Sequence, residues 1–193
     1  MRIVGGSHRG RRLLAPPGEK VRPTSDRARE ALFDILSHGK LAADGVPFVE
    51  AAVLDAFAGT GAFGLEALSR GAAEAVFIEQ DRAALAILQA NIASLGERGR
   101  TRVIPGDATR PPRATSPCAV VFLDPPYRSG LAAPALEALA AAGWLAAGAL
   151  ALVELAAREQ LVPPSGFVII DERRYGAARL VFLRYERTFG DER

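Results

Sequence analysis

The chain has 193 residues, enough for one domain with a full hydrophobic core but too few for a second large domain beside it. Hydrophobic residues make up 49% and charged residues 24%, proportions typical of a folded globular protein and not of a disordered one. The only cysteine, Cys118, excludes an internal disulfide, and its apolar neighbours indicate a buried structural thiol.

Neither a secretory signal nor a membrane span is indicated by the sequence. The first twelve residues mix arginines with glycines, and the longest uncharged run, 138–153, is shorter than a bilayer span and contains two glycines. We therefore expect a soluble, cytoplasmic protein. No long heptad pattern is present, which favours a monomer.

The positive charge is concentrated at the N-terminus. The formal net charge is +2, but residues 1–29 hold eight basic residues against two acidic ones, so this segment carries +6 and the remainder carries −4. Clustered arginines neutralise phosphates and bind them in bidentate fashion. The charge alone fits two alternatives equally well, a nucleic-acid-binding arm and a solvated basic tail.

The first elements predicted along the chain are a small hairpin and a helix. Residues 2–14 alternate short apolar pieces with turn-prone glycines, which indicates a hairpin that carries arginines. From Ala28 the apolar residues recur with helical spacing as far as His38, and the candidate N-caps are Thr24, Ser25 and Asp26.

After residue 47 short apolar strands alternate with amphipathic helices. Five strands are predicted over residues 53–57, 75–79, 102–105, 119–123 and 149–154, and helices over 63–70, 81–95 and 131–142. Two further strands, 167–172 and 180–185, are separated by a short turn and should pair in antiparallel fashion. The pattern predicts an α/β fold with a mostly parallel sheet of seven strands, covered by helices on both faces.

A glycine-rich loop follows the first strand in the stretch DAFAGTGAFG. Gly59, Gly61 and Gly64 have the spacing G-x-G-x-x-G of a dinucleotide loop, and Glu79 follows Gly59 by twenty residues. However, the carboxylate of Asp55 would repel a pyrophosphate, whereas it suits the ammonium group of S-adenosylmethionine. For a lone motif of this kind, a tight turn with no ligand also fits the spacing.

The loop resembles motif I of the class I methyltransferases, D-x-F-x-G-T/S-G. This resemblance implies that S-adenosylmethionine is the cofactor. It further implies that Glu79 binds the ribose hydroxyls and that Asp107, with Ala108 beside it, binds the adenine. The cofactor-binding residues predicted in this way are Asp55, Phe57, Gly59, Thr60, Gly61, Glu79, Asp107 and Ala108.

The stretch Asp124-Pro125-Pro126-Tyr127 follows the fourth strand and matches the D/N-P-P-Y/F/W signature of methyltransferases that act on exocyclic amines. The lone pair of a base amine is delocalised into the ring. Hydrogen bonds from the amine to Asp124 and to a carbonyl group of the rigid Pro-Pro backbone would free that lone pair. Tyr127 can stack on the base. We expect no metal, since His8 and His38 lack ligand spacing and are typical of surface or helix-end positions.

The runs GGSHRGRRL, RPTSDRAREALFDIL, DAFAGTGAFGLEALSRGA and FLDPPY, in this order, closely resemble the RsmD family of bacterial 16S rRNA guanine-N2 methyltransferases, which modify guanine 966. The resemblance covers most of the chain. It implies an RNA-binding extension over 1–24, a methyltransferase domain over 25–193, and 16S rRNA of the small ribosomal subunit as partner. The candidate RNA contacts carried over by position are Arg9, Arg11, Arg12, Arg22, Thr24 and Arg29, although Arg29 could equally pair with a neighbouring acid.

Three alternatives compete with this reading. Another amino-methyltransferase, acting on adenine N6 of DNA or RNA, shares the D-P-P-Y signature, but the chain has no room for a separate DNA-recognition domain. An NAD-dependent oxidoreductase would leave the signature and the basic arm unexplained. A non-catalytic RNA-binding module would keep its function when Asp124 is replaced.

Overall fold

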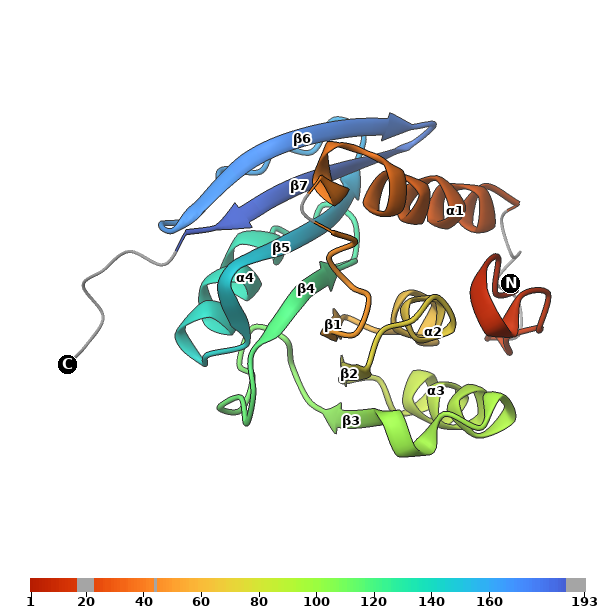
Figure 1. Cartoon of the computed structure of the whole chain (residues 1–193). Coiled ribbons are helices and arrows are strands. Elements are labelled where there is room, and N and C mark those ends of the chain that lie inside the picture. Colours follow the sequence, from red (N-terminus) through yellow and green to blue (C-terminus); the bar gives the residue numbers. More distant parts are fainter. Residues whose placement is uncertain (17–22, 44, 187–193) are drawn as a thin grey trace.

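A sheet of seven strands in the order β3-β2-β1-β4-β5-β7-β6 forms the centre of the protein (Figure 1). The structure is a computed structural model, and it describes residues 1–16, 23–43 and 45–186. The strands are β1 (Ala52–Ala56), β2 (Glu74–Glu79), β3 (Thr101–Pro105), β4 (Cys118–Leu123), β5 (Leu145–Ala156), β6 (Phe167–Tyr175) and β7 (Ala178–Tyr185). The helices are α1 (Pro23–His38), α2 (Ala62–Ser69), α3 (Arg82–Leu95) and α4 (Ala132–Ala141), with short 3-10 helices at Gly6–His8, Lys40–Ala42 and Arg98–Arg100.

The first five strands are parallel, and β7 pairs in antiparallel fashion with both β5 and β6. The predicted α/β class, the seven strands and the antiparallel last pair are thereby confirmed. The turn between β6 and β7 is tighter than predicted, because both strands extend until only Gly176 and Ala177 separate them. The carboxyl ends of β1, β2, β3 and β4 meet at one edge of the sheet, where ligands bind in open α/β sheets.

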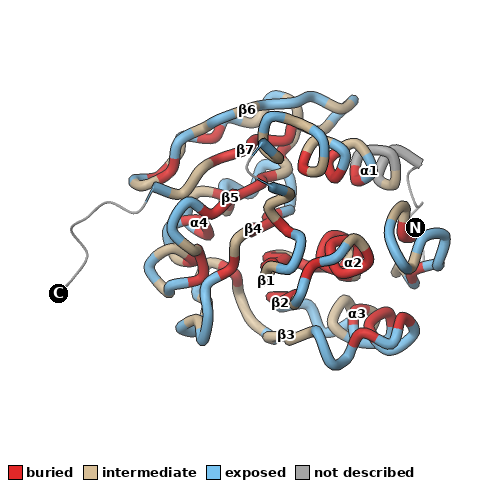
Figure 2. Tube along the Cα trace, viewed as in Figure 1, coloured by how far each residue is buried: buried red, intermediate tan, exposed pale blue. Residues whose placement is uncertain are grey.

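Two hydrophobic cores cover the two faces of this sheet. Helices α1, α2 and α3 pack over one face, where Phe33, Phe63 and Phe122 stack in sequence. Helix α4 and Trp144 cover the other face. Figure 2 shows that α2 and the central strands are buried almost throughout. Cys118 is 1% exposed, and burial raises the pKa of its thiol to about 12, so the prediction of a structural thiol is confirmed.

The predicted hairpin is present, since Arg2 and Arg12 form an antiparallel bridge and the amide of Ile3 donates to the carbonyl of Arg11. Helix α1 ends at His38 as predicted, but it begins at Pro23. Thr24, Ser25 and Asp26 therefore lie inside its first turn, and their prediction as N-caps was wrong. Proline suits this first position, because its fixed φ is helical and the amide it lacks would have no helical partner. In the described ranges, no helix is long and apolar enough to cross a membrane.

Candidate active site

The glycine loop begins with a backbone constraint directly after β1. Phe57 has a φ of 62°, a left-handed conformation that costs free energy for a non-glycine residue and is concentrated at functional sites. Gly61 and Gly64 are required by packing: a Cβ atom would lie 2.3 Å from Leu88 at the first and 2.4 Å from Phe77 at the second. A Cβ atom on Gly59 would meet nothing within 4 Å, so the backbone there is open to an approaching molecule.

Asp55 holds this loop from beneath. It is 2% exposed, and its Oδ2 accepts a hydrogen bond of 3.0 Å from the amide of Gly64 in the first turn of α2. Burial raises the pKa of Asp55 to about 8, aided by the charge of Glu79 and opposed by hydrogen bonds from the loop and by Arg29. Asp55 thus orders the start of α2, a role in addition to the ammonium contact predicted for it.

The two other predicted cofactor carboxylates follow β2 and β3. Glu79 accepts hydrogen bonds of 2.7 Å from the amides of Gly59 and Asp81, which ties the end of β2 to the glycine loop. Asp107 accepts from the amide and the hydroxyl of Thr109, and these hydrogen bonds lower its pKa. Asp107 therefore forms a turn, as it would do without any ligand.

Asp124 lies at the end of β4, where its amide donates to the carbonyl of Ala56 at 3.5 Å. Its side chain is open to solvent, yet protein surrounds it closely enough that desolvation, followed by the charges of Glu154 and Asp55, raises its pKa well above the ordinary value. Pro125 is buried behind it, while Pro126 and Tyr127 are exposed. The structure therefore brings Asp55, Glu79 and Asp124 to one edge of the sheet.

Glu154 on β5 belongs to the same cluster and was missed by the sequence analysis. Its Oε1 accepts a hydrogen bond of 2.9 Å from the Tyr127 hydroxyl. Desolvation raises the pKa of Glu154, and the bond from Tyr127 opposes this rise. The sequence signal for it was a single carboxylate inside the apolar strand ALALVELA, close to the end where parallel strands present ligand-binding groups.

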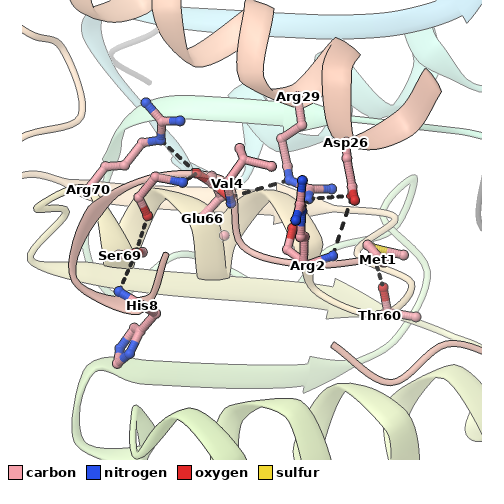
Figure 3. Close-up of polar contacts among 12 residues, drawn as sticks. Met1, Arg2, Val4, His8, Asp26, Arg29, Thr60, Glu66, Ser69 and Arg70 are labelled. Carbon is pink, nitrogen blue, oxygen red and sulfur yellow. Dashed lines mark hydrogen bonds and ion pairs between the residues drawn. The ribbon is translucent and has the colours of Figure 1, made fainter. Parts of the chain in front are cut away.

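The N-terminal hairpin is docked on α2 through one buried carboxylate (Figure 3). Glu66 is 0% exposed and accepts hydrogen bonds of 2.8 Å from the amides of Val4 and Gly5. Its charge is balanced by Arg70 at 2.7 Å and Arg29 at 3.5 Å. Because the hairpin supplies two of these donors, its first residues are part of the folded core.

Arg29 is 8% exposed and binds Asp26 at 2.9 Å and the carbonyl of Arg2. The candidate RNA contact at Arg29 is thus replaced by an internal ion pair, the alternative that its position left open. His8 is also not an isolated surface residue, since its Nε2 lies 2.5 Å from Glu97 on the loop after α3. His38 is at a helix end as predicted.

Asn91 on α3 links the hairpin to the glycine loop and was also missed. It is fully buried; its Oδ1 accepts from the amide of Leu14 at 2.7 Å, and its Nδ2 donates to the carbonyls of Leu14 and Thr60 at 3.2 and 3.0 Å. A lone asparagine in an amphipathic helix gives no sequence signal for this role. One side chain thus fixes the end of the arm against the loop predicted to bind the cofactor.

Three of the candidate RNA-binding arginines are at the surface. Arg9, Arg11 and Arg12 are exposed, and Arg11 donates to the carbonyl of Ser94 at 2.6 Å. Arg22 lies outside the described residues, and Thr24 lies in the first turn of α1. The described part of the chain has no group of three side chains suited to hold a metal ion.

Most of the chain has counterparts among known proteins. Residues 1–184 match the model of the family described as Conserved hypothetical protein 95. Ribosomal RNA small subunit methyltransferase D of Escherichia coli K12 is 44% identical over 155 residues, which cover 80% of this chain and 74% of that protein. The enzyme of the same name from Haemophilus influenzae is 34% identical over 181 residues, 91% of this chain and 89% of that protein.

A solved structure of the Escherichia coli protein yhhF superposes with a TM-score of 0.82 at 38% identity, covering 97% of this chain and 99% of that one. A hypothetical protein from Thermus thermophilus gives a TM-score of 0.72 at 35% identity, covering 94% and 98%. Family model, sequence identity and superposition each extend over most of the chain. The chain therefore belongs to the RsmD family of methyltransferases.

Proposed function

We propose that this protein transfers a methyl group from S-adenosylmethionine to the exocyclic N2 amine of guanine 966 in 16S rRNA of the small ribosomal subunit. The observation that carries the proposal is the position of Asp124, at the end of β4 beside the glycine loop and within the D-P-P-Y turn. The names of the relatives, ribosomal RNA small subunit methyltransferase D, support the class of substrate. The guanine and its N2 amine rest on the resemblance of the arm and motifs to the RsmD family.

The charges at the edge of the sheet fit a cationic cofactor. The charge of Glu79 raises the pKa of Asp55, and that of Asp55 raises the pKa of Asp124, and a sulfonium with a nearby ammonium would relieve this repulsion. The open side of Gly59 admits close approach to the backbone, Glu79 would accept the ribose hydroxyls and Asp107 the adenine amine. S-adenosylmethionine supplies, when bound, a methyl group on a sulfonium whose thioether is a good leaving group.

The residues of the D-P-P-Y turn then orient the nucleophile. Asp124 would accept a hydrogen bond from the N2 amine, and the Pro125 carbonyl, held by the rigid turn, would accept the second. Asp124 would thereby orient the amine towards the methyl group, and its ionised carboxylate would accept the proton that the methylated nitrogen loses. Its raised pKa makes it a better proton acceptor than an ordinary aspartate. Tyr127, which is 45% exposed, would stack on the flipped-out base.

The arm is proposed to bind the RNA backbone. Arg9 and Arg12 are exposed, and Arg12 lines, with Arg2 and with Asp26 of α1, an open concavity of about 300 Å³ beside the hairpin. Guanidinium groups on a rigid hairpin can hold phosphates in a fixed position relative to the active site. Arg11, Arg22 and Thr24 remain proposed contacts, whereas Arg29 leaves this set because it is buried in an ion pair.

The test is methyl transfer from labelled S-adenosylmethionine to small ribosomal subunits from cells that lack this enzyme, with naked 16S rRNA and unmethylated DNA in parallel. The expected product after digestion is N2-methylguanosine at one site. Asp124→Ala should abolish transfer and retain cofactor binding, whereas Glu137→Ala, an exposed change on α4, should leave transfer unchanged. Label in N6-methyladenosine or only in DNA would refute the substrate. Full function of the Asp124→Ala variant would favour the non-catalytic alternative.

A further inference from the structure

The base-binding side of the candidate site contains a second carboxylate, Glu154, next to Asp124. In the register of the parallel strands, Leu123 of β4 pairs with Val153 of β5, so the residues that follow them, Asp124 and Glu154, stand side by side. Both have the same parity along their strands as Phe122 and Leu152, which lie in the core beneath α1 and α2. Both carboxylates therefore belong to the face of the sheet on which Asp55 also lies.

The present partner of Glu154 is the hydroxyl of Tyr127, at 2.9 Å. Tyr127 is also the residue whose ring can stack on the substrate base, and its position just after the Pro-Pro turn places it at the mouth of the site. A rotation of the tyrosine onto a base would take this donor away from Glu154. A carboxylate is an acceptor only, so a half-buried one needs a replacement N–H or O–H donor.

Among the bases that carry an exocyclic amine, only guanine offers a second donor adjacent to it. The ring nitrogen N1 of guanine carries a hydrogen beside the N2 amine. The nitrogen beside the N6 amine of adenine, N1, and the nitrogen beside the N4 amine of cytosine, N3, carry lone pairs. A carboxylate pair therefore matches the N1–H and N2–H donors of guanine and faces a repulsive lone pair in adenine and cytosine.

We propose that Glu154 determines the specificity of this site for guanine by accepting the N1–H hydrogen bond while Asp124 accepts that of the N2 amine. This inference rests on the proposed function and deepens it, because the D-P-P-Y turn alone serves any exocyclic amine. Desolvation raises the pKa of both carboxylates, and the charge of Glu154 adds to the rise at Asp124, as expected of two acceptors held close together. Glu154 contacts the base and leaves the methyl transfer itself to Asp124.

The test replaces the hydrogen-bond donor at N1 of the target base by an acceptor. Small subunits are assembled with 16S rRNA that carries either guanosine or 2-aminopurine ribonucleoside at the target position. 2-Aminopurine keeps the N2 amine but presents a lone pair at N1. The measured quantity is the ratio of kcat/KM for guanosine over 2-aminopurine. 2-Aminopurine also lacks the O6 atom of guanine, and this loss enters the ratio of every enzyme variant. The change in the ratio between variants therefore reports the N1 contact.

In the Glu154→Gln variant the amide can donate to the bare N1, so the ratio should fall by about tenfold or more. Glu154→Ala removes the acceptor without adding a donor and should lower the ratio by a smaller factor. Glu159→Gln is the matched control: Glu159 accepts the amide of Arg128 at 2.9 Å, and its variant should keep the wild-type ratio. Tyr127→Phe removes only the hydroxyl and should also keep that ratio.

A merely structural role for Glu154 predicts that its variants lower transfer to both bases by the same factor, and that outcome would overturn the inference. If Glu154 served only to hold the tyrosine, Tyr127→Phe would reproduce the effect of Glu154→Gln, which would also refute it. A failure of the proposed function is distinguishable from both, since the wild-type enzyme would then place no methyl group on guanine N2 of the unmodified subunit.

Discussion

The side-chain amide of Asn91 donates a hydrogen bond of 3.0 Å to the carbonyl of Thr60, the residue between Gly59 and Gly61. The same side chain is bound to both backbone groups of Leu14 at the end of the arm. Asn91 itself is fully buried, whereas Leu14 is exposed, so the bonds to Leu14 lie where the arm meets the protein surface. The arm and the glycine loop are therefore both held by Asn91, and its replacement should alter the position of both.

Replacement of Asn91 by alanine should weaken cofactor binding and loosen the arm together. The half-buried carbonyl of Thr60 would lose its partner, at a cost of up to about 1–3 kcal/mol. The amide of Leu14, which is 57% exposed, would exchange its fixed partner for water. Calorimetric titration with S-adenosylmethionine should show a dissociation constant raised about tenfold or more, and limited proteolysis should cleave near residue 14 faster. Gln89→Ala, an exposed change on the same helix, is the control. Unchanged affinity in Asn91→Ala would show that the loop does not need this anchor.

Glu66 should be essential for stability. Its replacement by alanine leaves Arg29 and Arg70 without a shared carboxylate and the amides of Val4 and Gly5 without an acceptor. The removal of one partner from a buried ion pair costs about 3–5 kcal/mol. Urea denaturation should report a loss of this size in the free energy of unfolding. The same substitution at the exposed helical residue Glu137 should change it by less than about 0.5 kcal/mol.

Periodicity and motif spacing predicted the sheet and the position of the site because both depend on local sequence. Apolar runs indicated every strand, and parallel strands placed Asp55, Glu79 and Asp124 at one edge without any knowledge of contacts. Hydrogen bonds between distant parts of the chain leave no such local pattern. Glu66 pairs with residues 61 and 62 positions away, and Asn91 with one 77 positions away.

The sequence predicted least well the roles of side chains whose partners lie far away in the chain. The sequence left Arg29 open between RNA and a neighbouring acid, and only its burial against Glu66 and the carbonyl of Arg2 favours the pair with Asp26. His8 was assigned no partner because Glu97, which binds it, is 89 residues away. Glu154 looked like one polar residue in a core strand, and only the pairing of β4 with β5 reveals Asp124 beside it.

The arm should contribute to the salt dependence of RNA affinity. Joint replacement of Arg9, Arg11 and Arg12 by glutamine removes three exposed cations on the hairpin. Each phosphate contact contributes roughly 0.7–0.9 to the slope of log affinity against log salt, so the slope should fall by about 2. Joint replacement of Arg113, Arg173 and Arg174 makes the same change in net charge away from the arm and should leave the slope close to that of the wild type. Equal slopes for the two triple variants would mean that the arm does not bind RNA phosphates and is only a solvated basic segment.

Asp55 should make the stability of the protein depend on pH. Its carboxyl has a pKa of about 8 when folded, against 3.8 for the unperturbed group, so the folded chain retains a proton that the unfolded chain releases between these values. Stability from this group is therefore present at low pH and is lost as the pH rises from about 4 to about 8. In Asp55→Asn the amide oxygen can still accept from Gly64. Urea denaturation at pH 5 and pH 8 should show that this variant loses less stability than the wild type.

The same carboxyl should couple cofactor binding to proton release. Near pH 7 a group with a pKa of about 8 is mostly protonated, and a cation placed beside it favours its ionised form. Binding of S-adenosylmethionine should then release a proton, so its affinity should increase as the pH rises towards 8. Calorimetry in buffers of different ionisation enthalpy measures this proton, which should be absent in Asp55→Asn and retained in Asp34→Asn, a change on the exposed surface of α1. If Asp55→Asn releases as many protons as the wild type, the ammonium of the cofactor lies away from Asp55.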